Sequence, residues 1–560
     1  MLGLPSSSPQ LCRVKAAVTA AIKVIFLVKA RPVIKFFFIF EQLLYTKHSQ
    51  IFMKKKAIIP FAVFIAGLCS IIYELLISTT ATYFLGDGVR QFSIIIGVYL
   101  FSMGIGAFLT KFLKHKPLIF FINVEYLLGF IGGISVPLLY MLFVYVSPTV
   151  LQISCLAIIF IIGLLTGMEV PLLTFALEDS NIKNNLSNIL SLDYIGGLIA
   201  TLIFPFIILP FVGLYYSSLI FGIVNILLGI VLNYTILKDK KRNSIYGFLV
   251  IAVLLVLVIF GGRFLEVWDQ KIYKRPIVLN EQTPYQKIVM TKNSDDVRLY
   301  LNRVIQFASS DEYRYHESLV HVPLAMHNNP KRVLILGGGE NLASREVLKN
   351  KKVQQIDVVD IDSTMFYLAK ENQYLKEINE NAALNEKVNL IAQDAFTFLF
   401  NNDERYDIII ADLPDPTNQA IARLYSKQFF LMAKRNLKRD GVFVTQAGEI
   451  YFSNTVFSCI NNTLKSVFET VEPYHTYIPS FGDWGFIIAK NSNNTNSLSP
   501  NALPKDLKFL NPNQVEQTFV FPLDIKIADT KLNTLDNPII LNYFLDDWGK
   551  WKADFQTGTK

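Results

Sequence analysis

The chain has 560 residues, of which 52% are apolar and only 18% are charged, and its mean hydropathy is +0.37. This composition excludes a purely soluble protein, a disordered chain and a collagen-like chain. Residues 1–56 carry ten Lys and Arg against one acid, residues 57–262 nine against eight, and residues 263–560 34 against 36. The net charge of +8 therefore belongs to the first segment, and the slightly acidic last segment argues against nucleic-acid binding.

Residues 1–56 form a basic leader. Within it, Met53 is followed by three lysines and then by apolar residues, which is how a membrane protein with a cytoplasmic N-terminus commonly begins. We interpret Met53 as a candidate for the true start of the protein. The alternative is that residues 1–52 form an eighth apolar span or a targeting segment.

Residues 57–262 predict a membrane domain of about seven helices. Each apolar stretch has roughly 17–25 residues, enough to span a hydrocarbon core. The stretches lie at about residues 57–84, 92–113, 117–146, 150–174, 192–212, 214–236 and 246–262. Glu74 and Glu169 fall inside them, where ionisable groups are costly, so both are candidates for a substrate or proton site. The alternative is that each lies near a span end or pairs with a polar helix face.

Basic segments between the stretches raise a question of orientation. If all seven helices cross the membrane, three basic segments lie on the same side of it, at residues 54–56, 111–116 and 238–242. The positive-inside rule makes that side cytoplasmic. An odd number of crossings then places residues 263 onward outside the cytoplasm.

After Gly262 the pattern changes to short strands and amphipathic helices. Residues 263–327 predict a small β subdomain with hairpin-like strands at residues 287–290 and 297–307. Residues 328–490 predict a Rossmann-like α/β domain, because short apolar strands alternate with helical stretches as in a parallel, doubly wound sheet. The strands are expected at residues 332–336, 355–361, 388–391, 406–412 and 441–446. A polar linker and a C-terminal extension follow at residues 491–560.

A glycine turn follows the first of these strands. Gly337, Gly338 and Gly339 lead into Glu340 and then a helix, so the backbone can approach a ligand closely. Asp360 ends the next strand, where an acid can hold ribose hydroxyls. This pair predicts a nucleoside-bearing ligand. The turn lacks the later glycines of the dinucleotide fingerprint, which disfavours NAD.

Further acids stand at the ends of the other strands. Since the carboxyl ends of parallel strands converge, we expect one acidic crevice, formed by Glu340, Asp360, Asp394, Asp412 and Asp415. Any one of them alone could instead be a helix N-cap or a solvated turn. With no His or Cys cluster and no basic residue in these turns, the crevice suits cationic ligands, and no metal is expected.

Several motifs occur in order between about residues 283 and 487. They are Tyr285-Gln286; Leu301-Asn302 with Gln306-Phe307; Asp311-Glu312 with Tyr315-His316-Glu317; Gly337-Gly338-Gly339-Glu340 with Arg345-Glu346-Val347-Leu348; Val359-Asp360-Ile361-Asp362; Asp394-Ala395; Asp412-Leu413-Pro414-Asp415-Pro416; and Pro479-Ser480-Phe481-Gly482-Asp483-Trp484-Gly485-Phe486. On these motifs the soluble half resembles the spermidine synthase (polyamine aminopropyltransferase) family. The whole chain resembles the membrane-spanning bacterial branch of that family.

The resemblance implies transfer of an aminopropyl group from decarboxylated S-adenosylmethionine to a diamine such as putrescine, giving spermidine and methylthioadenosine without a cofactor. It implies that Asp412 is the general base and that Tyr315 and Asp415 hold the acceptor amine. The implied donor-binding residues are Gln286, His316, Gly337, Gly339, Glu340, Asp360 for the ribose, and Asp394 with Ala395 for the adenine. Physical chemistry supports the assignment, because an ammonium group with a pKa of about 10 must lose a proton before it can attack.

The chain departs from the family pattern at two places. Glu340 stands where the family usually has Asp, and Asn341 and Leu342 replace the glycines that usually follow. Ile478 precedes Pro479 where many soluble members have a Tyr that contacts the acceptor, although Tyr477 is adjacent. Donor chemistry is therefore predicted more firmly than the identity of the acceptor.

Two other functions stay open. One is an S-adenosylmethionine-dependent methyltransferase, which shares this sheet, and the other is a polyamine transporter or sensor whose soluble half is a binding module. For the transferase we expect a multi-pass protein of the inner membrane in contact with the lipid bilayer. The catalytic half is expected in the cytoplasm, because the donor is made there. Either one apolar stretch then does not cross fully, or the positive-inside rule fails for this chain. The resemblance also allows a homo-oligomer, and no nucleic-acid partner is expected.

Overall fold

The computed structural model describes residues 51–86, 88–178, 185–236, 242–491, 499 and 503–557. The chain divides into two compact units, a helical unit that ends at Trp268 and an α/β unit that begins at Asp269. Most of the expected leader, together with the possible eighth span, lies outside the described residues. Met53 falls within the first described helix, α2 (Ile51–Leu85).

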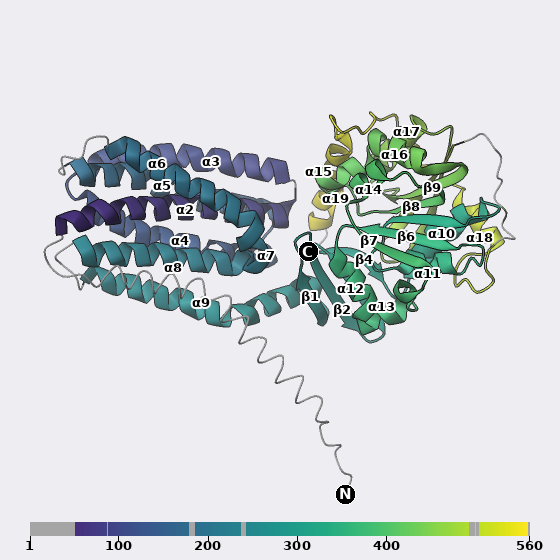
Figure 1. The fold of residues 1–560 in the computed structure, drawn as a ribbon, viewed down its shortest axis with the longest axis horizontal. Helices are drawn as coiled ribbons and strands as arrows, with labels where there is room; N and C mark the ends of the chain where they lie inside the picture. The colour runs from purple at the N-terminus through teal and green to yellow at the C-terminus, as the bar shows by residue number, and fades with distance from the viewer. Residues whose placement is uncertain are drawn as a thin grey trace, which may run out of the picture. The chain divides into compact units, whose positions relative to one another are not determined.

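The helical unit consists of long helices joined by short connections (Figure 1). After α2 come α3 (Gly88–Leu109), η1 (Thr110–Phe112), α4 (Pro117–Tyr145), α5 (Pro148–Glu178), α6 (Asn185–Ile203), η2 (Phe204–Ile208), α7 (Leu209–Phe211), α8 (Gly213–Ile236) and α9 (Arg242–Tyr273). In the described ranges, seven helical segments are long and apolar enough to cross a membrane. The last of them continues to Tyr273, beyond the expected end at residue 262.

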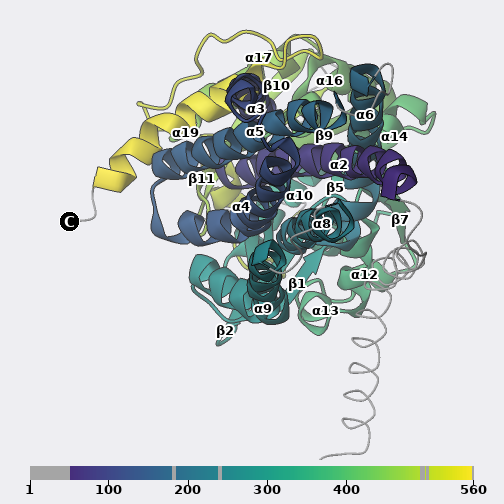
Figure 2. The same ribbon diagram turned by 90° about the vertical axis from the view of Figure 1, so that its left-hand side faces the viewer.

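Helix α2 is the core of the helical unit and contacts α4, α5, α6 and α8 (Figure 2). Its apolar segment is 72% buried, whereas the segments built on α3, α6 and α9 are 22%, 22% and 17% buried. Helices α4 and α8 pack closely through glycines. A Cβ on Gly222 would lie 2.5 Å from the carbonyl oxygen of Gly129, so larger residues are excluded at this contact.

The α/β unit begins with a four-stranded antiparallel sheet in the order β1-β2-β3-β4. Its strands are β1 (Ile277–Gln282), β2 (Lys287–Asn293), β3 (Asp296–Leu301) and β4 (Val304–Ala308). Asn302 and Arg303 connect β3 to β4 and both have positive φ, as the two central residues of a tight hairpin turn require.

A seven-stranded sheet in the order β10-β11-β9-β8-β5-β6-β7 forms the centre of the α/β unit. The five strands expected from the sequence are present and parallel: β5 (Arg332–Gly337), β6 (Gln355–Asp360), β7 (Val388–Ala392), β8 (Tyr406–Asp412) and β9 (Leu437–Glu449). The antiparallel strands β10 (Thr470–Ile478) and β11 (Gly482–Lys490) extend the sheet beyond them. Strand order reverses between β5 and β8, which is where a doubly wound sheet opens a binding crevice.

Helices cover both faces of this sheet. One apolar core contains residues of α14 (Ala395–Asn401), α16 (Lys427–Asn436), α17 (Asn454–Lys465) and α19 (Ile539–Thr557), and a second contains residues of α10 (Glu312–Ala325), α11 (Leu342–Leu348) and α18 (Pro512–Thr518). The remaining elements are α12 (Ser363–Glu371), α13 (Gln373–Ile378), η3 (Ala382–Leu384), α15 (Gln419–Ala422) and η4 (Arg423–Tyr425). The result is a Rossmann-like α/β fold.

Candidate active site

A cavity of about 380 Å³ lies at the carboxyl ends of β5, β6 and β8. The structure brings ten of the eleven predicted site residues to its wall: Gln286, Tyr315, His316, Gly337, Glu340, Asp360, Asp394, Ala395, Asp412 and Asp415. Gly339 does not line the cavity. The convergence of strand ends therefore predicted that these residues line one cavity, and their roles stay a prediction.

The glycine turn after β5 has a conformation that larger residues would strain. Gly337 and Gly338 have φ of +85° and +62°, and a Cβ on Gly337 would lie 1.9 Å from the carbonyl oxygen of Asp412. Asn341, which replaces a family glycine, has φ of 68° and donates a side-chain hydrogen bond to the Gly339 carbonyl at 2.9 Å. Asn tolerates this left-handed conformation, so the substitution is compatible with the turn.

Asp360 is held at the end of β6 by backbone donors. Its Oδ1 accepts from the Asp362 amide at 2.8 Å, and its Oδ2 accepts from the Gly339 amide at 3.2 Å. Gly339 thus contributes by positioning Asp360. Burial and the nearby charges of Glu340 and Asp362 raise the pKa of Asp360 to about 7. Gln286 is fixed nearby by a 3.1 Å hydrogen bond to Asp362 Oδ2.

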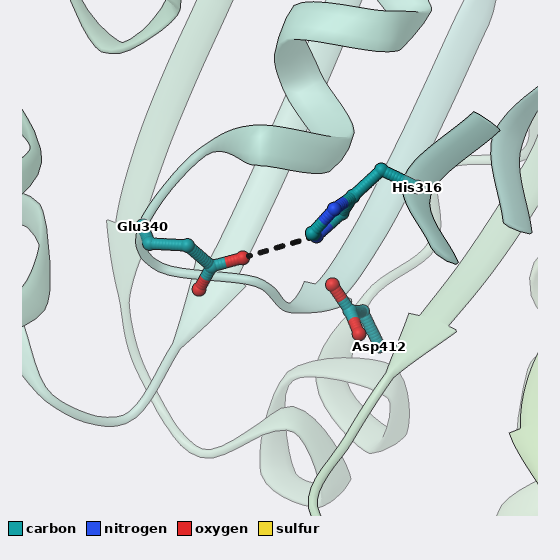
Figure 3. A group of neighbouring side chains, drawn as sticks. All are labelled: His316, Glu340 and Asp412. Atoms are coloured by element: carbon teal, nitrogen blue, oxygen red, sulfur yellow. Dashed lines mark ion pairs between the residues drawn. The ribbon is translucent and has the colours of Figure 1, made fainter. Parts of the chain in front are cut away.

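Asp412, His316 and Glu340 point toward one another at the end of β8 (Figure 3). The Tyr315 hydroxyl donates to Asp412 Oδ1 at 2.7 Å, and His316 Nε2 lies 3.9 Å from Glu340 Oε1. Burial and repulsion from Glu340 raise the pKa of Asp412 to about 6, although His316 and Tyr315 limit the rise. A carboxylate with this pKa is ionised at neutral pH and accepts a proton more readily than an ordinary Asp.

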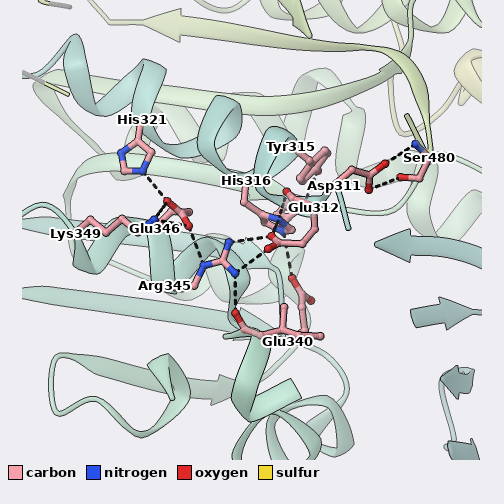
Figure 4. Close-up of polar contacts among 12 residues, drawn as sticks. Asp311, Glu312, Tyr315, His316, His321, Glu340, Arg345, Glu346, Lys349 and Ser480 are labelled. Atoms are coloured by element: carbon pink, nitrogen blue, oxygen red, sulfur yellow. Dashed lines mark hydrogen bonds and ion pairs between the residues drawn. The ribbon is translucent and has the colours of Figure 1, made fainter. Parts of the chain in front are cut away.

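A buried network holds His316 in its charged form (Figure 4). Its Nδ1 donates to the Glu312 carbonyl at 2.8 Å and to Glu312 Oε2 at 2.9 Å, and Glu312 forms a two-bonded ion pair with Arg345 at 2.9 Å. Burial opposes the imidazolium charge, but the hydrogen bond to Glu312 and the nearby carboxylate of Glu340 raise the pKa of His316 to about 10. Glu312 and Arg345 were not among the predicted site residues. The four-residue spacing of Glu312 and His316 on one helix was the available signal.

His316, Glu340 and Asp412 each place one atom within 4.8 Å of the other two, so a metal must be considered. A metal ligand requires a neutral imidazole, and the imidazolium of His316 supplies the positive charge itself. In the described residues a second such group comprises His327, Asp407 and Asp440, but Asp407 already accepts from Lys438 Nζ at 2.9 Å. The expectation of no required metal stays a prediction.

Asp415 lies on the loop after β8 and is fixed by a residue that the sequence analysis missed. Gln446 on β9 contacts Asp415 Oδ1 at 3.4 Å and donates to the Leu413 carbonyl at 2.7 Å. Burial raises the pKa of Asp415 to about 6, and the Gln446 contact opposes the rise. Phe481 and Trp484 add an aromatic wall beside Tyr315, with ring centroids 6.0 and 6.5 Å from that of Tyr315.

Asp394 takes the N-cap position that the sequence analysis considered as its alternative. Its Oδ2 accepts from the amide and hydroxyl of Thr397 at 2.9 and 2.7 Å, and its Oδ1 accepts from Arg423 at 2.7 Å. Both carboxylate oxygens are therefore engaged within the protein. Arg423 comes from η4 and also lines the cavity, so the site contains a basic group that the strand-end turns did not reveal.

The fold and the site together define a class of protein. A Rossmann-like sheet, a cavity at its switch point and several carboxylates around that cavity are the features of an α/β enzyme that binds a nucleoside-bearing, cationic co-substrate.

Comparisons with known proteins identify the family. Residues 312–500 match the family model described as Spermine/spermidine synthase domain. The polyamine aminopropyltransferase of Leptospira interrogans is 38% identical over 495 residues, covering 87% of this chain and 98% of that protein. That of Oceanobacillus iheyensis is 35% identical over 505 residues, covering 89% and 98%. A crystal structure of spermidine synthase with the transition state analogue AdoDATO is 24% identical, with a TM-score of 0.42, covering 49% of this chain and 89% of that one. The chain belongs to the polyamine aminopropyltransferase (spermidine synthase) family.

The likeness to the bacterial relatives includes much of the helical unit. A match of 495 residues is longer than the whole segment of residues 269–560. The family model covers only part of the α/β unit. These relatives therefore share both units with this chain.

Proposed function

We propose that this protein transfers the aminopropyl group of decarboxylated S-adenosylmethionine to putrescine or a similar diamine, giving spermidine and methylthioadenosine. The observation that carries the proposal is the position of Asp412. This buried carboxylate, bonded to Tyr315 at 2.7 Å and with a pKa of about 6, shares one cavity with Glu340, Asp360 and Asp415.

The donor occupies the side of the cavity formed by β5 and β6. Asp360 receives the ribose hydroxyls, with Gly339 holding its carboxylate and Gly337 giving the ligand access to the backbone. Ala395 and Asp394 border the adenine, where Asp394 acts through its bonds to Arg423 and to the start of α14. Gln286, His316 and Glu340 surround the aminopropyl end of the donor.

The acceptor occupies the side near β8, where Tyr315 and Asp415 hold its amine. Asp412 accepts a proton from the attacking ammonium group, which frees the nitrogen lone pair. The nitrogen then forms a bond to the propyl carbon attached to sulfur, and the carbon–sulfur bond breaks. Its electron pair stays on sulfur, so methylthioadenosine leaves as a neutral thioether.

Electrostatics explains why the site needs several acids. Donor and acceptor are both cations, and their close approach is unfavourable without compensating charge. Carboxylates around the cavity reduce this repulsion, and the fixed arrangement makes the encounter effectively intramolecular.

The direct test is a mass-spectrometric product assay on the detergent-purified full chain. The protein is supplied with decarboxylated S-adenosylmethionine and a panel of diamines, and in a parallel reaction with S-adenosylmethionine. Methylthioadenosine appearing with spermidine is the expected result. Methylated products with S-adenosylmethionine instead would indicate the methyltransferase alternative. Donor binding without any turnover would favour the sensor or transporter alternative.

We further propose that the helical unit is embedded in the inner membrane as a multi-pass anchor. Exposed apolar side chains on α3, α6 and α9 support this placement, since lipid would cover them. We place the α/β unit in the cytoplasm with its donor, although the basic connections favour the opposite orientation. Labelling of an Asp403→Cys variant by a membrane-impermeant maleimide in intact spheroplasts decides between them. Protection until lysis is expected, and labelling before lysis would reverse the orientation.

A further inference from the structure

Two carboxyl groups are completely enclosed in the helical unit. Glu125 on α4 is 0% exposed and Glu169 on α5 is 2% exposed. The sequence analysis singled out Glu169 but not Glu125. Such groups are costly in an apolar interior and mark functional sites when they occur in membrane-type helices.

Hydrogen bonding around the two groups is incomplete. Within the described residues, neither carboxylate oxygen of Glu125 has a partner, and Oε1 of Glu169 has none. Asn225 on α8 is also fully buried, and both atoms of its side-chain amide lack a partner. Buried polar atoms are nearly always satisfied in native proteins, so this concentration of unsatisfied atoms points to something bound there.

The packing of α4 against α8 brings Glu125 and Asn225 to the same contact. The Cβ of Glu125 lies 3.4 Å from the Cβ position of Gly229, and the Cβ of Asn225 lies 3.2 Å from that of Gly129. Glu125 and Gly129 are one turn apart on α4, as are Asn225 and Gly229 on α8. The amide of Asn225 therefore lies about one helical turn from Glu125. Helix α5, which carries Glu169, also packs against α4, and the charges of Glu125 and Glu169 influence each other.

Ser70 on α2 is the polar neighbour of Glu169. Its hydroxyl donates to the Ala66 carbonyl at 2.7 Å and, more weakly, to Glu169 Oε2 at 3.2 Å. Glu169 therefore has one weak, neutral donor, which does not compensate a buried negative charge.

The absence of a paired cation in the described ranges and the close helix packing both favour a proton as the ligand of Glu125 and Glu169. Among the described residues, neither Glu125 nor Glu169 forms an ion pair with a Lys, Arg or His side chain. Glycine contacts leave little room: a Cβ on Gly129 would lie 2.7 Å from the Gly222 carbonyl, and a Cβ on Gly132 would lie 2.5 Å from the ring of Tyr73. A buried carboxylate without a paired cation is neutralised by taking up a proton.

We infer that Glu125 and Glu169 form an exchangeable proton-binding pair in the helical unit, with Ser70 and Asn225 as its polar surroundings. The titratable groups that interact with the pair are Cys69 and Tyr73 on α2, Tyr99 on α3 and Asp193 on α6. Chains of such groups conduct protons in membrane pumps and transporters. The inference gives the helical unit a proton-binding site that is separate from the aminopropyl-transfer site.

The test is infrared difference spectroscopy of the full chain reconstituted in lipid, following the carbonyl stretch of protonated carboxylic acids. At neutral pH the wild type should show this band, and it should shift after exchange into heavy water. Glu125→Gln and Glu169→Gln should each reduce the band, while Glu125→Asp should retain it. Glu266→Gln, which changes an exposed acid on α9, is the matched control. Retained aminopropyl transfer and a symmetric size-exclusion peak establish that each variant is folded.

Three outcomes would overturn the inference. Equal band intensity in wild type, Glu125→Gln and Glu169→Gln would show that neither group holds the proton. A band that does not shift in heavy water would show that the proton is not exchangeable. A band that appears only after sodium is removed from the buffer would identify an alkali ion as the natural ligand. Loss of aminopropyl transfer in wild type would contradict the proposed function and leave this test intact.

Discussion

The two units of the molecule bury carboxyl groups in opposite ways. In the α/β unit, Glu312 is bonded twice to Arg345 and also to His316, and Glu346 is bonded to His321 and Lys349. In the helical unit, Glu125 has no hydrogen-bond partner within the described residues. Both units therefore contain the same chemical group in an apolar environment, with and without compensation from the protein.

The role of a buried carboxyl group depends on which positive charge compensates it. A buried carboxylate paired with Arg keeps a fixed charge and acts as structure. Asp412 and Asp415 form an intermediate case, because they lack basic hydrogen-bond partners but border a cavity that cationic substrates can enter. Within the described residues, Glu125 and Glu169 form no ion pair with a basic side chain, so we infer that a proton is the compensating ion.

The largest expected effect is a loss of turnover when Asp412, a carboxyl group at the cavity, is replaced. Asp412→Asn should lower turnover on the order of a hundredfold to ten-thousandfold while largely sparing donor binding, because the amide keeps the shape but cannot accept the proton. Methylthioadenosine release gives turnover, and equilibrium dialysis with decarboxylated S-adenosylmethionine gives donor affinity. Asp403→Asn, at an exposed position, is the control. Unchanged turnover in Asp412→Asn would remove Asp412 from the role of general base.

Removal of Arg345 tests the carboxyl groups of the α/β unit that are paired with basic residues. Arg345→Met should lower the free energy of unfolding of the full chain in detergent by about 3–5 kcal/mol, because it leaves the buried Glu312 and Glu346 undercompensated. Urea titration followed by tryptophan fluorescence measures the change. The double variant Glu312→Gln with Arg345→Met should recover part of the loss.

The matched substitution in the helical unit sharpens this prediction. Glu125→Gln removes a carboxyl group that has no partner to lose, so the cost should be much smaller than that of Arg345→Met. Equal losses in the two variants would contradict the distinction between paired and unpaired carboxyl groups.

The sequence predicted the architecture where a signal is local. Apolar stretches of sufficient length located the seven helices, and the positions of strand ends located the cavity residues. The hairpin of β10 and β11 was missed as secondary structure, although Pro479 to Phe486 was recognised as a motif. Its pairing with β9 depends on contacts with residues 442–449, which periodicity within the hairpin does not reveal.

The ion-pair partners of the acidic residues could not be predicted from the sequence. Arg345 is 33 positions from Glu312, and Arg423 is 29 positions from Asp394, so only folding brings each pair together. Glu125 was overlooked although it lies inside the expected stretch at residues 117–146, where the signal that selected Glu74 and Glu169 was also present. Its lack of partners within the described residues is visible only in the structure. Site composition thus follows from strand topology, whereas protonation follows from three-dimensional neighbours.

The pH dependence of kcat/KM should report the raised pKa of Asp412. Because Asp412 must be ionised to act as a base and its pKa is raised to about 6, kcat/KM should fall about tenfold per pH unit below about 6. An ordinary Asp would lose activity only near pH ~4. Glu340→Gln removes the negative charge that raises the pKa of Asp412, so the decline should move to lower pH. A decline at the same pH in Glu340→Gln would exclude this electrostatic influence.

The smallest expected effect concerns the length of the Glu340 side chain. Glu340→Asp, which restores the usual family residue, moves the carboxylate one methylene away from His316 and increases their present separation of 3.9 Å. The KM for the donor should rise by less than about tenfold, because the carboxylate charge is kept and only its ion pair with His316 is weakened. Turnover and the KM for the diamine should stay unchanged, since Tyr315 and Asp412 keep their 2.7 Å bond. Steady-state kinetics with each substrate varied in turn measures kcat and the two KM values separately. A fall in kcat would mean that Glu340 acts on the reacting atoms, and Glu340 would then belong with Asp412 among the groups whose charge changes during the reaction.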